Sequence, residues 1–387
     1  METIYLPCDN WKDTDEQKTL SNETAHPQKQ DITDKNYIEN ILDRISTDEK
    51  QTSLIEPEKK IKEPEFLKKT YSQKWPAYDL AKTNEYGIIK SLAYELIGAY
   101  CNSPISHKDF KVREELLCMI LHTYFCGSLR KTISFLQSIK KEGLISKVPC
   151  YKTLSNYFSE GSLTNVLENL ITISSIPLAS FEKTLAIDSS GFSKGMYSQW
   201  SEYKWGKPTG KEREWLKLHA CIGTKTNVFF KAEVTSKNVA DCPEFPGLLT
   251  EAVKYVDAEE VVADLAYSSR KNMDTAIALG LVPYIPFKIN ARGLAKGSAI
   301  WKTMFNEFQR NRETYMEKYH ARSNVETNFH MLKTKFGNKL RTKSFETEKN
   351  ELLTKVLVHN LCVLIQESFE MGIKLDFDAC VKKMDSV

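Results

Sequence analysis

The sequence predicts an α/β protein: a mixed five-stranded sheet with flanking helices, preceded by an all-α region. Between residues 75 and 171, apolar side chains recur at helical spacing. From Lys183 onward they form short β-branched runs, which are typical of strands. One amphipathic helical segment lies between the third and fourth runs, and another lies between the fourth and fifth. With the helix that follows the fifth run, the expected order is β-β-β-α-β-α-β-α. That order indicates a three-stranded meander followed by helical crossovers.

The beginning of the chain is expected to contribute little to any core. Residues 1–35 carry eight acidic residues against four lysines, and polar residues dominate as far as residue 70. We therefore predict a largely disordered polar leader over residues 1–70. The whole chain of 387 residues has a net charge of +3, so the part after residue 35 carries about +7. This modest positive charge is too weak to establish a nucleic-acid partner by itself.

Residues 71–175 are predicted to form a small all-α region with a possible DNA-binding surface. A helix over 128–141 is followed by a connector and by a second helix from Pro149 through Phe158. This pair suits a helix-turn-helix in which Lys152 and Asn156 face a DNA groove. An ordinary helical hairpin fits the same pattern equally well.

Residues 180–370 are predicted to form the α/β domain. Its strands are expected at 184–188, 215–222, 228–234, 261–264 and 281–287, and its first helices at 245–256 and 269–279. A polar stretch then leads to Lys318, a long helix begins near Ser323, and a closing helix covers 352–367. We expect residues 371–387 to form a C-terminal tail that frays.

Two acidic residues follow predicted buried strands. Asp188 comes after Leu185-Ala186-Ile187, and Asp264 comes after Val261-Val262-Ala263. In a sheet of this order the first and fourth strands are usually neighbours, so the two carboxylates should face each other. A divalent cation relieves the repulsion between such groups. The alternative is that each Asp only caps a turn.

A third element carries charged groups on one narrow helix face. The four residues are Tyr319, Arg322, Glu326 and Lys333. At 100° per residue they fall, in this order, at about 0°, 300°, 340° and 320° around a helix. A phenol, two cations and a carboxylate on one face suit contacts with phosphate and metal. Alternatively, Glu326 only closes a capping box with Ser323.

The spacing of this face, Tyr, two residues, Arg, three residues, Glu, six residues, Lys, resembles the signature of DDE transposases of the family-four group of bacterial and archaeal insertion sequences. The resemblance covers roughly residues 183–366. It implies a ribonuclease-H-like core in which Asp188, Asp264 and Glu326 are catalytic and hold two Mg²⁺ or Mn²⁺ ions. It also implies that the Tyr, Arg and Lys of the signature contact DNA.

The resemblance further implies cleavage and strand transfer on double-stranded DNA, both terminal inverted repeats and target, by a homodimer in a synaptic complex. Too few residues separate Asp264 from Glu326 for a large insertion domain, and Trp301 in that segment either packs in the core or stacks on a flipped base. Two other functions stay open. One is a transposase-derived repressor or architectural DNA-binding protein, and the other is a metal-dependent DNA nuclease.

Further DNA contacts are expected from basic loops, although such loops are often only solvated. These residues are Lys204 and Lys207 after the first strand and Lys288 and Arg292 after the fifth. The nine cysteines include no C-x-x-C pair, which indicates a reducing cytoplasm. Because DNA contacts are expected, the protein would associate with the nucleoid there. No secretory signal or bilayer-spanning apolar run is evident, so we expect no membrane partner.

Overall fold

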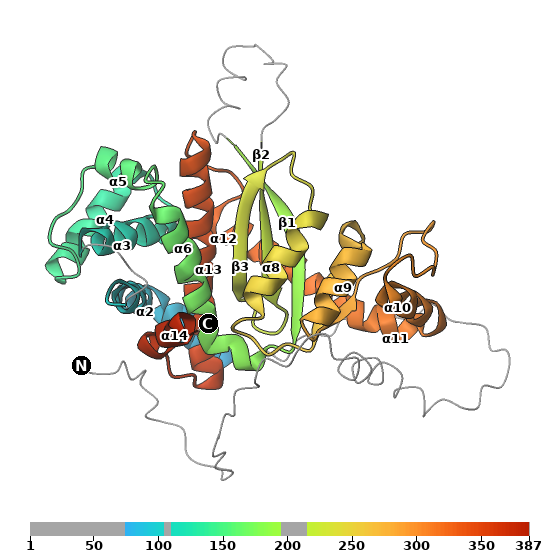
Figure 1. Cartoon of the computed structure of the whole chain (residues 1–387). Coiled ribbons are helices and arrows are strands. Elements are labelled where there is room, and N and C mark those ends of the chain that lie inside the picture. Colours follow the sequence, from blue (N-terminus) through green and yellow to red (C-terminus); the bar gives the residue numbers. More distant parts are fainter. Residues whose placement is uncertain (1–73, 104–109, 195–214, 387) are drawn as a thin grey trace, which may run out of the picture.

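The computed structural model describes residues 74–103, 110–194 and 215–386. The leader predicted over residues 1–70 lies outside the described residues, as do Lys204 and Lys207. Within the described ranges, a central sheet and one long helix form the middle of the molecule (Figure 1).

The first described part is helical throughout, as the apolar spacing predicted. Its helices are α2 (Trp75–Cys101), α3 (Phe110–Phe125), α4 (Leu129–Lys141), α5 (Tyr151–Tyr157) and α6 (Leu163–Ser175), followed by the 3₁₀ turn η2 (Ile176–Phe181). Helix α4 begins where the side chain of Ser128 accepts a hydrogen bond from Lys131 N, and it buries Leu136 and Ile139 on one face. Sequence periodicity therefore predicted the all-α character of this part.

The pair α4 and α5 departs from a compact helix-turn-helix. The connector runs from Glu142 to Cys150, whereas the turn of that motif has about three to four residues. Helix α5 begins after Cys150, whose sulfur accepts a hydrogen bond from Thr153 N, rather than at Pro149. Lys152 and Asn156 are exposed on it.

The predicted mixed sheet is confirmed. Its strands are β1 (Thr184–Ser193), β2 (Trp215–Gly223), β3 (Phe229–Ser236), β4 (Glu260–Ala263) and β5 (Val282–Tyr284), in the spatial order β3-β2-β1-β4-β5. Strands β1, β2 and β3 pair antiparallel, whereas β1 pairs with β4, and β4 with β5, in parallel. Strand β1 continues past its expected end because its ladder with β2 extends to the pair Ser193 and Trp215.

The remaining elements are mostly helices. They are η3 (Cys242–Glu244), α8 (Phe245–Ala252), η4 (Leu265–Tyr267), α9 (Arg270–Ala278), α10 (Ala299–Arg310), α11 (Arg312–Tyr319), η5 (His320–Arg322), α12 (Ser323–Phe336), α13 (Phe345–Met371) and α14 (Phe377–Asp385). Two sequence expectations were wrong. The polar stretch before Lys318 contains α10 and α11, and α10 buries Trp301, Met304 and Phe308 at helical spacing.

The second wrong expectation concerns the C-terminal tail, which was predicted to fray. Instead it forms α14, which packs against α2 and α6. Asp376 caps this helix by accepting a hydrogen bond from Ala379 N at 2.9 Å, and Phe377 and Val381 are buried. A short amphipathic helix with an N-cap is stable here because the earlier helices supply the apolar surface that it covers.

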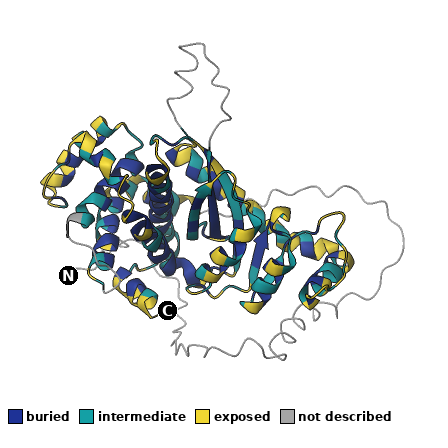
Figure 2. Cartoon of the chain, turned by 45° about the horizontal axis from the view of Figure 1, so that its top comes forward, coloured by how far each residue is buried: buried dark blue, intermediate teal, exposed yellow. Residues whose placement is uncertain are grey.

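Helix α13 joins the helical region to the sheet. It stands with α6 between the strands and helices α2 to α5 (Figure 1), and it is largely buried (Figure 2). On α13, Asn360 accepts a hydrogen bond from Phe229 N at 2.9 Å and donates one to Phe229 O at 2.8 Å. These bonds satisfy backbone groups of the edge strand β3, so the sheet does not present that part of its edge for pairing.

The same helix has the length and apolar composition of a membrane span. However, 83% of its apolar window is buried inside the protein, as in the core helix of a folded domain. Among the described residues no other helix passes the test of length and composition. The burial of α13 therefore explains its composition without a membrane.

Candidate active site

Asp188 lies within β1, on the face of the sheet that α12 covers. Successive residues of a strand point to opposite faces. Ser190 accepts a hydrogen bond from Lys333 Nζ of α12 at 2.7 Å, whereas Ser189 donates one to Asp241 Oδ1 at 3.0 Å on the other face. Asp188 shares the face of Ser190, so it points toward α12. The sequence expectation that Asp188 ends its strand was wrong, although its position in the sheet was right.

Asp264 directly follows β4, the strand beside β1. The parallel ladder between β1 and β4 ends at the pair Ile187 and Ala263, and each acid is the next residue along the chain. The predicted proximity of the two strand positions is therefore confirmed. Asp264 also serves as the N-cap of η4, where its side chain accepts a hydrogen bond from Ala266 N. The alternative that Asp264 caps a turn is therefore correct for this residue.

Arg322 connects Asp188 to Glu326. Its Nη1 lies 3.2 Å from Asp188 Oδ2, and its Nη2 lies 2.6 Å from Glu326 Oε1. Its Nε donates a hydrogen bond to the hydroxyl of Tyr319 at 3.0 Å. Residues from β1, α11, η5 and α12 therefore meet at one guanidinium.

The signature residues share one side of the structure, but they do not lie on one continuous α-helix. Helix α11 ends at Tyr319, the 3₁₀ turn η5 contains Arg322, and α12 begins at Ser323. No side chain caps the start of α12, and Glu326 pairs with Arg322 instead. The capping-box interpretation of Glu326 was therefore wrong.

Burial and like charges shape the electrostatics of this site. Burial raises the pKa of Asp188 to about 6, and the neighbouring carboxylates of Asp264 and Glu326 push it in the same direction. The hydrogen bond from Ser189 N and the charge of Arg322 oppose this shift. Burial also lowers the pKa of Lys333. Positive charge beside Asp188 is thus favourable, and Arg322 supplies it.

Helix α12 is anchored to the turn between β2 and β3. Asn324 Nδ2 donates a hydrogen bond to Thr224 O at 2.9 Å, and Asn328 Nδ2 donates one to Asn227 O at 2.7 Å. The turn is itself held by the buried carboxylate of Glu182, which accepts a hydrogen bond from Thr226 N at 2.6 Å. These contacts fix the helix that carries Glu326. They could not be predicted from the sequence, because single Asn residues on a helix face carry no periodic signal.

A second polar cluster that sequence analysis missed lies on the opposite face of β1. Asp241 accepts hydrogen bonds from Ser189 Oγ and from Lys217 Nζ, each at 3.0 Å, and its carboxylate lies 3.6 Å from His219 Nδ1. His219 is fully buried. It is a packed residue that alternates with apolar neighbours along β2. The cluster supports the strand that carries Asp188, and burial followed by the charge of Asp188 raises the pKa of nearby Tyr267.

The other residues predicted to contact DNA are spread over two parts of the surface. Lys288 and Arg292 are exposed after β5, at the same end of the parallel strands as Asp264. Trp301 is 6% exposed, donates a hydrogen bond to Arg292 O at 2.9 Å and packs edge-on against Phe287. Trp301 therefore packs in the core. Lys152 and Asn156 lie on α5, in the separate helical region.

The donor chemistry at Asp188 suits a hard divalent cation, because all three candidate ligands are carboxylates. The raised pKa of Asp188 indicates a place where added positive charge stabilises the ionised form. As the side chains stand, no three His, Cys, Asp or Glu residues of the described ranges are grouped closely enough to hold a metal ion. Arg322 occupies the position between Asp188 and Glu326. The residues thus fit a cation chemically, with the guanidinium now in contact with two of them.

Asp188 lies on β1, Asp264 directly follows the neighbouring strand β4, and Glu326 lies on α12, which packs against β1. Three acids in this arrangement suit phosphodiester chemistry. The comparison with known families agrees. Residues 179–361 match the family model described as "Transposase DDE domain". The matched segment contains the whole sheet, the three acids and α12. This match supports a DDE transposase.

Proposed function

We propose that the protein is a DDE transposase of an insertion sequence, in the family-four group, with a ribonuclease-H-like core. It would bind terminal inverted repeats and catalyse DNA cleavage and strand transfer. The observation that carries the proposal is the adjacency of Asp188 and Asp264 in the sheet, with Glu326 joined to Asp188 through Arg322. The match of residues 179–361 to a transposase DDE domain supports it.

In this proposal Asp188, Asp264 and Glu326 hold two Mg²⁺ ions, for which Mn²⁺ can substitute. Bound ions of this kind activate the attacking hydroxyl and stabilise the leaving oxygen in phosphoryl transfer. Asp188 must be ionised to act as a ligand, so protonation at low pH competes with its role. Glu326 is exposed in the first turn of α12, where its side chain is free to turn from Arg322 toward a cation.

The cations of the site would position DNA. Arg322 can leave the carboxylates and form paired hydrogen bonds with a phosphate, for which its planar guanidinium is suited. Lys333 can meet a second phosphate as a point charge, and Tyr319 can donate its hydroxyl. The exposed Lys288 and Arg292 would extend this contact along the same end of the sheet.

The helical region would recognise the ends of the element. Lys152 and Asn156 are exposed on α5, where they can reach a DNA groove. Lys204 and Lys207, which lie outside the described residues, would add contacts to the DNA backbone. Two DNA ends must be cut together, so the active form would be a homodimer, acting on nucleoid DNA in the cytoplasm.

The test uses the full-length protein, Mg²⁺ and labelled DNA that carries the element's terminal repeats. Joined products support transposition, cleavage without joining indicates a nuclease, and binding without cleavage indicates a repressor or architectural protein. Asp188→Asn and Glu326→Gln should each lose cleavage while binding stays near that of the wild type. Glu317→Gln, which changes an exposed carboxylate of α11, is the control and should cut normally. Cleavage by Asp188→Asn at the wild-type rate would overturn the assignment.

A further inference from the structure

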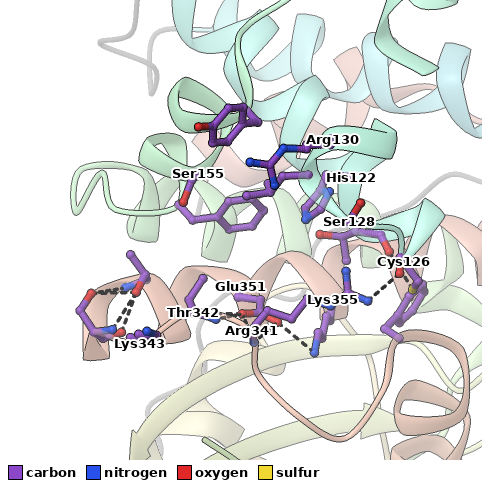
Figure 3. Close-up of a pocket in the computed structure, with 17 residues that line it drawn as sticks. His122, Cys126, Ser128, Arg130, Ser155, Arg341, Thr342, Lys343, Glu351 and Lys355 are labelled. Carbon is purple, nitrogen blue, oxygen red and sulfur yellow. Dashed lines mark hydrogen bonds and ion pairs between the residues drawn. The ribbon is translucent and has the colours of Figure 1, made fainter. Parts of the chain in front are cut away.

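A concave site lies between the helical region and the start of α13, apart from the proposed catalytic residues. It is a cavity of about 630 Å³, within the range of about 300–1,000 Å³ that is common for small-molecule sites. Figure 3 shows Arg130 and Ser155 on one wall, and Thr342 and Lys343 on the opposite wall. No residue of the proposed catalytic site lines it.

The walls of this cavity are cationic. The charged lining residues are Arg130, Arg341, Lys343 and Lys355, against the single carboxylate of Glu351. That carboxylate is already compensated, because Glu351 accepts a hydrogen bond from Arg341 N at 2.9 Å and lies 3.3 Å from Lys355 Nζ. Burial, followed by the charge of Arg341, lowers the pKa of His122 in the lining to about 4, so that ring is neutral near pH 7. The cavity therefore favours an anion.

Two of the cations remain available to a ligand. The guanidinium of Arg341 is used within the protein, because it donates hydrogen bonds to Cys126 O and Gly127 O. Arg130 and Lys343 are exposed, and neither forms an ion pair with another residue in the part of the chain that the structure describes. Arg130 belongs to the first turn of α4, which contains no acidic residue, so the partial positive charge of that helix end adds to the field.

The cavity also has an aromatic wall. Tyr151 is 48% exposed, and the guanidinium carbon of Arg130 lies 4.5 Å from the centre of its ring. Phe158 and Phe336 contribute further aromatic surface to the lining. Exposed aromatic rings beside arginine are the usual platform for stacking a nucleic-acid base. Inorganic phosphate would engage the cations but leave this wall unused.

We propose that this cavity binds a nucleotide, with the base stacked on Tyr151 and the phosphate held by Arg130 and Lys343. The same chemistry can come from an unpaired nucleotide of bound DNA or from a free mononucleotide. The first source rests on the proposed function, whereas the second does not. Either source would occupy the junction between the helical region and α13.

The experiment titrates the full-length protein with two fluorescent probes. One is N-methylanthraniloyl-AMP, and the other is a DNA duplex with a single unpaired 2-aminopurine. Stacking on Tyr151 should quench 2-aminopurine, and binding should raise the anisotropy of the mononucleotide. We expect saturable binding of at least one probe. Arg130→Ala and Tyr151→Ala should each weaken binding about tenfold or more. The loss of one stacking contact or of one charge contact reduces affinity by about this factor.

Two further variants keep the test decisive. Lys141→Ala removes an exposed lysine of the same helix that does not line the cavity, so it should bind within about twofold of the wild type. Ser155→Trp fills the cavity from α5 and should block binding even where a truncation has little effect. Circular dichroism of each variant checks that the fold is retained.

The pattern of binding identifies the source of the nucleotide. Variant-sensitive quenching of the duplex without mononucleotide binding assigns the cavity to DNA, and the converse assigns it to a free nucleotide. Absence of binding of both probes at millimolar concentration would overturn the proposal, as would equal binding by wild type, Arg130→Ala and Tyr151→Ala. Asp188→Asn should lose DNA cleavage but keep this binding, so failure of one proposal is distinguishable from failure of the other.

Discussion

Replacing Asn328 by alanine should show that a single buried amide positions the helix that carries Glu326. The side chain of Asn328 is fully buried, and its Nδ2 donates a hydrogen bond to Asn227 O at 2.7 Å. That carbonyl would keep one partner, His359 Nε2 at 3.1 Å, so it would not be left wholly unpaired. The loss is therefore one buried hydrogen bond plus a small void, about 1–3 kcal/mol of unfolding free energy.

The assay unfolds wild type and variant with guanidinium and monitors the transition by far-ultraviolet circular dichroism. Both curves are fitted with one shared slope of unfolding free energy against denaturant concentration. Thr327→Ala is the matched control, because its exposed side chain bonds only Ser323 O, one turn earlier on α12. It should change stability by less than about 0.5 kcal/mol. Asn328→Ala should also slow DNA cleavage, although Asn328 lies on the buried side of α12 and contacts none of the three acids.

Equal stability and equal cleavage in Asn328→Ala and Thr327→Ala would show that the Asn328 amide does not position α12. The turn between β2 and β3 would then not hold α12, and the position of Glu326 would have to depend on the apolar face of the helix alone. A loss of stability without any change in cleavage would mean that the tether supports the fold but does not position the site.

Two other predictions concern stability. Burial lowers the pKa of His122 to about 4, so the unfolded chain takes up a proton below pH 6.5 that the folded state excludes. The neutral ring therefore contributes stability above pH 6.5, and this stability is lost as the pH falls. This loss reaches about 2 kcal/mol at pH 5. The difference in unfolding free energy between pH 7.5 and pH 5.0 should therefore be smaller in His122→Asn than in the wild type by that amount. An identical difference in both proteins would contradict this prediction. Gly223→Ala places a methyl group against the Glu182 carboxylate, whose oxygens are held by the turn, and should cost about 1–3 kcal/mol. Gly247→Ala, with open space around its Cβ position, should be nearly neutral in the same unfolding assay, and equal effects of the two substitutions would exclude the steric cause.

The sequence alone determined the layers of the fold and the positions of two acids in the sheet. Short apolar runs and helical periodicity report burial and local geometry, and these are set by neighbours along the chain. The adjacency of the first and fourth strands could be predicted because a meander followed by crossovers allows few arrangements. Asp188 and Asp264 therefore fell at adjacent positions as expected. Helices α10 and α14 were not predicted, although the residues that each of them buries recur at helical spacing.

Only the tertiary structure decided what surrounds those acids. The guanidinium of Arg322 meets Asp188 from far along the chain, and the amide of Asn328 meets the turn at Asn227. Arg341, which lines the cationic cavity, likewise donates hydrogen bonds to the carbonyls of Cys126 and Gly127. Such polar contacts join residues that are distant in sequence, and each depends on where two packed elements place a side chain to within a few tenths of an ångström. Periodicity along one segment carries no information of that kind.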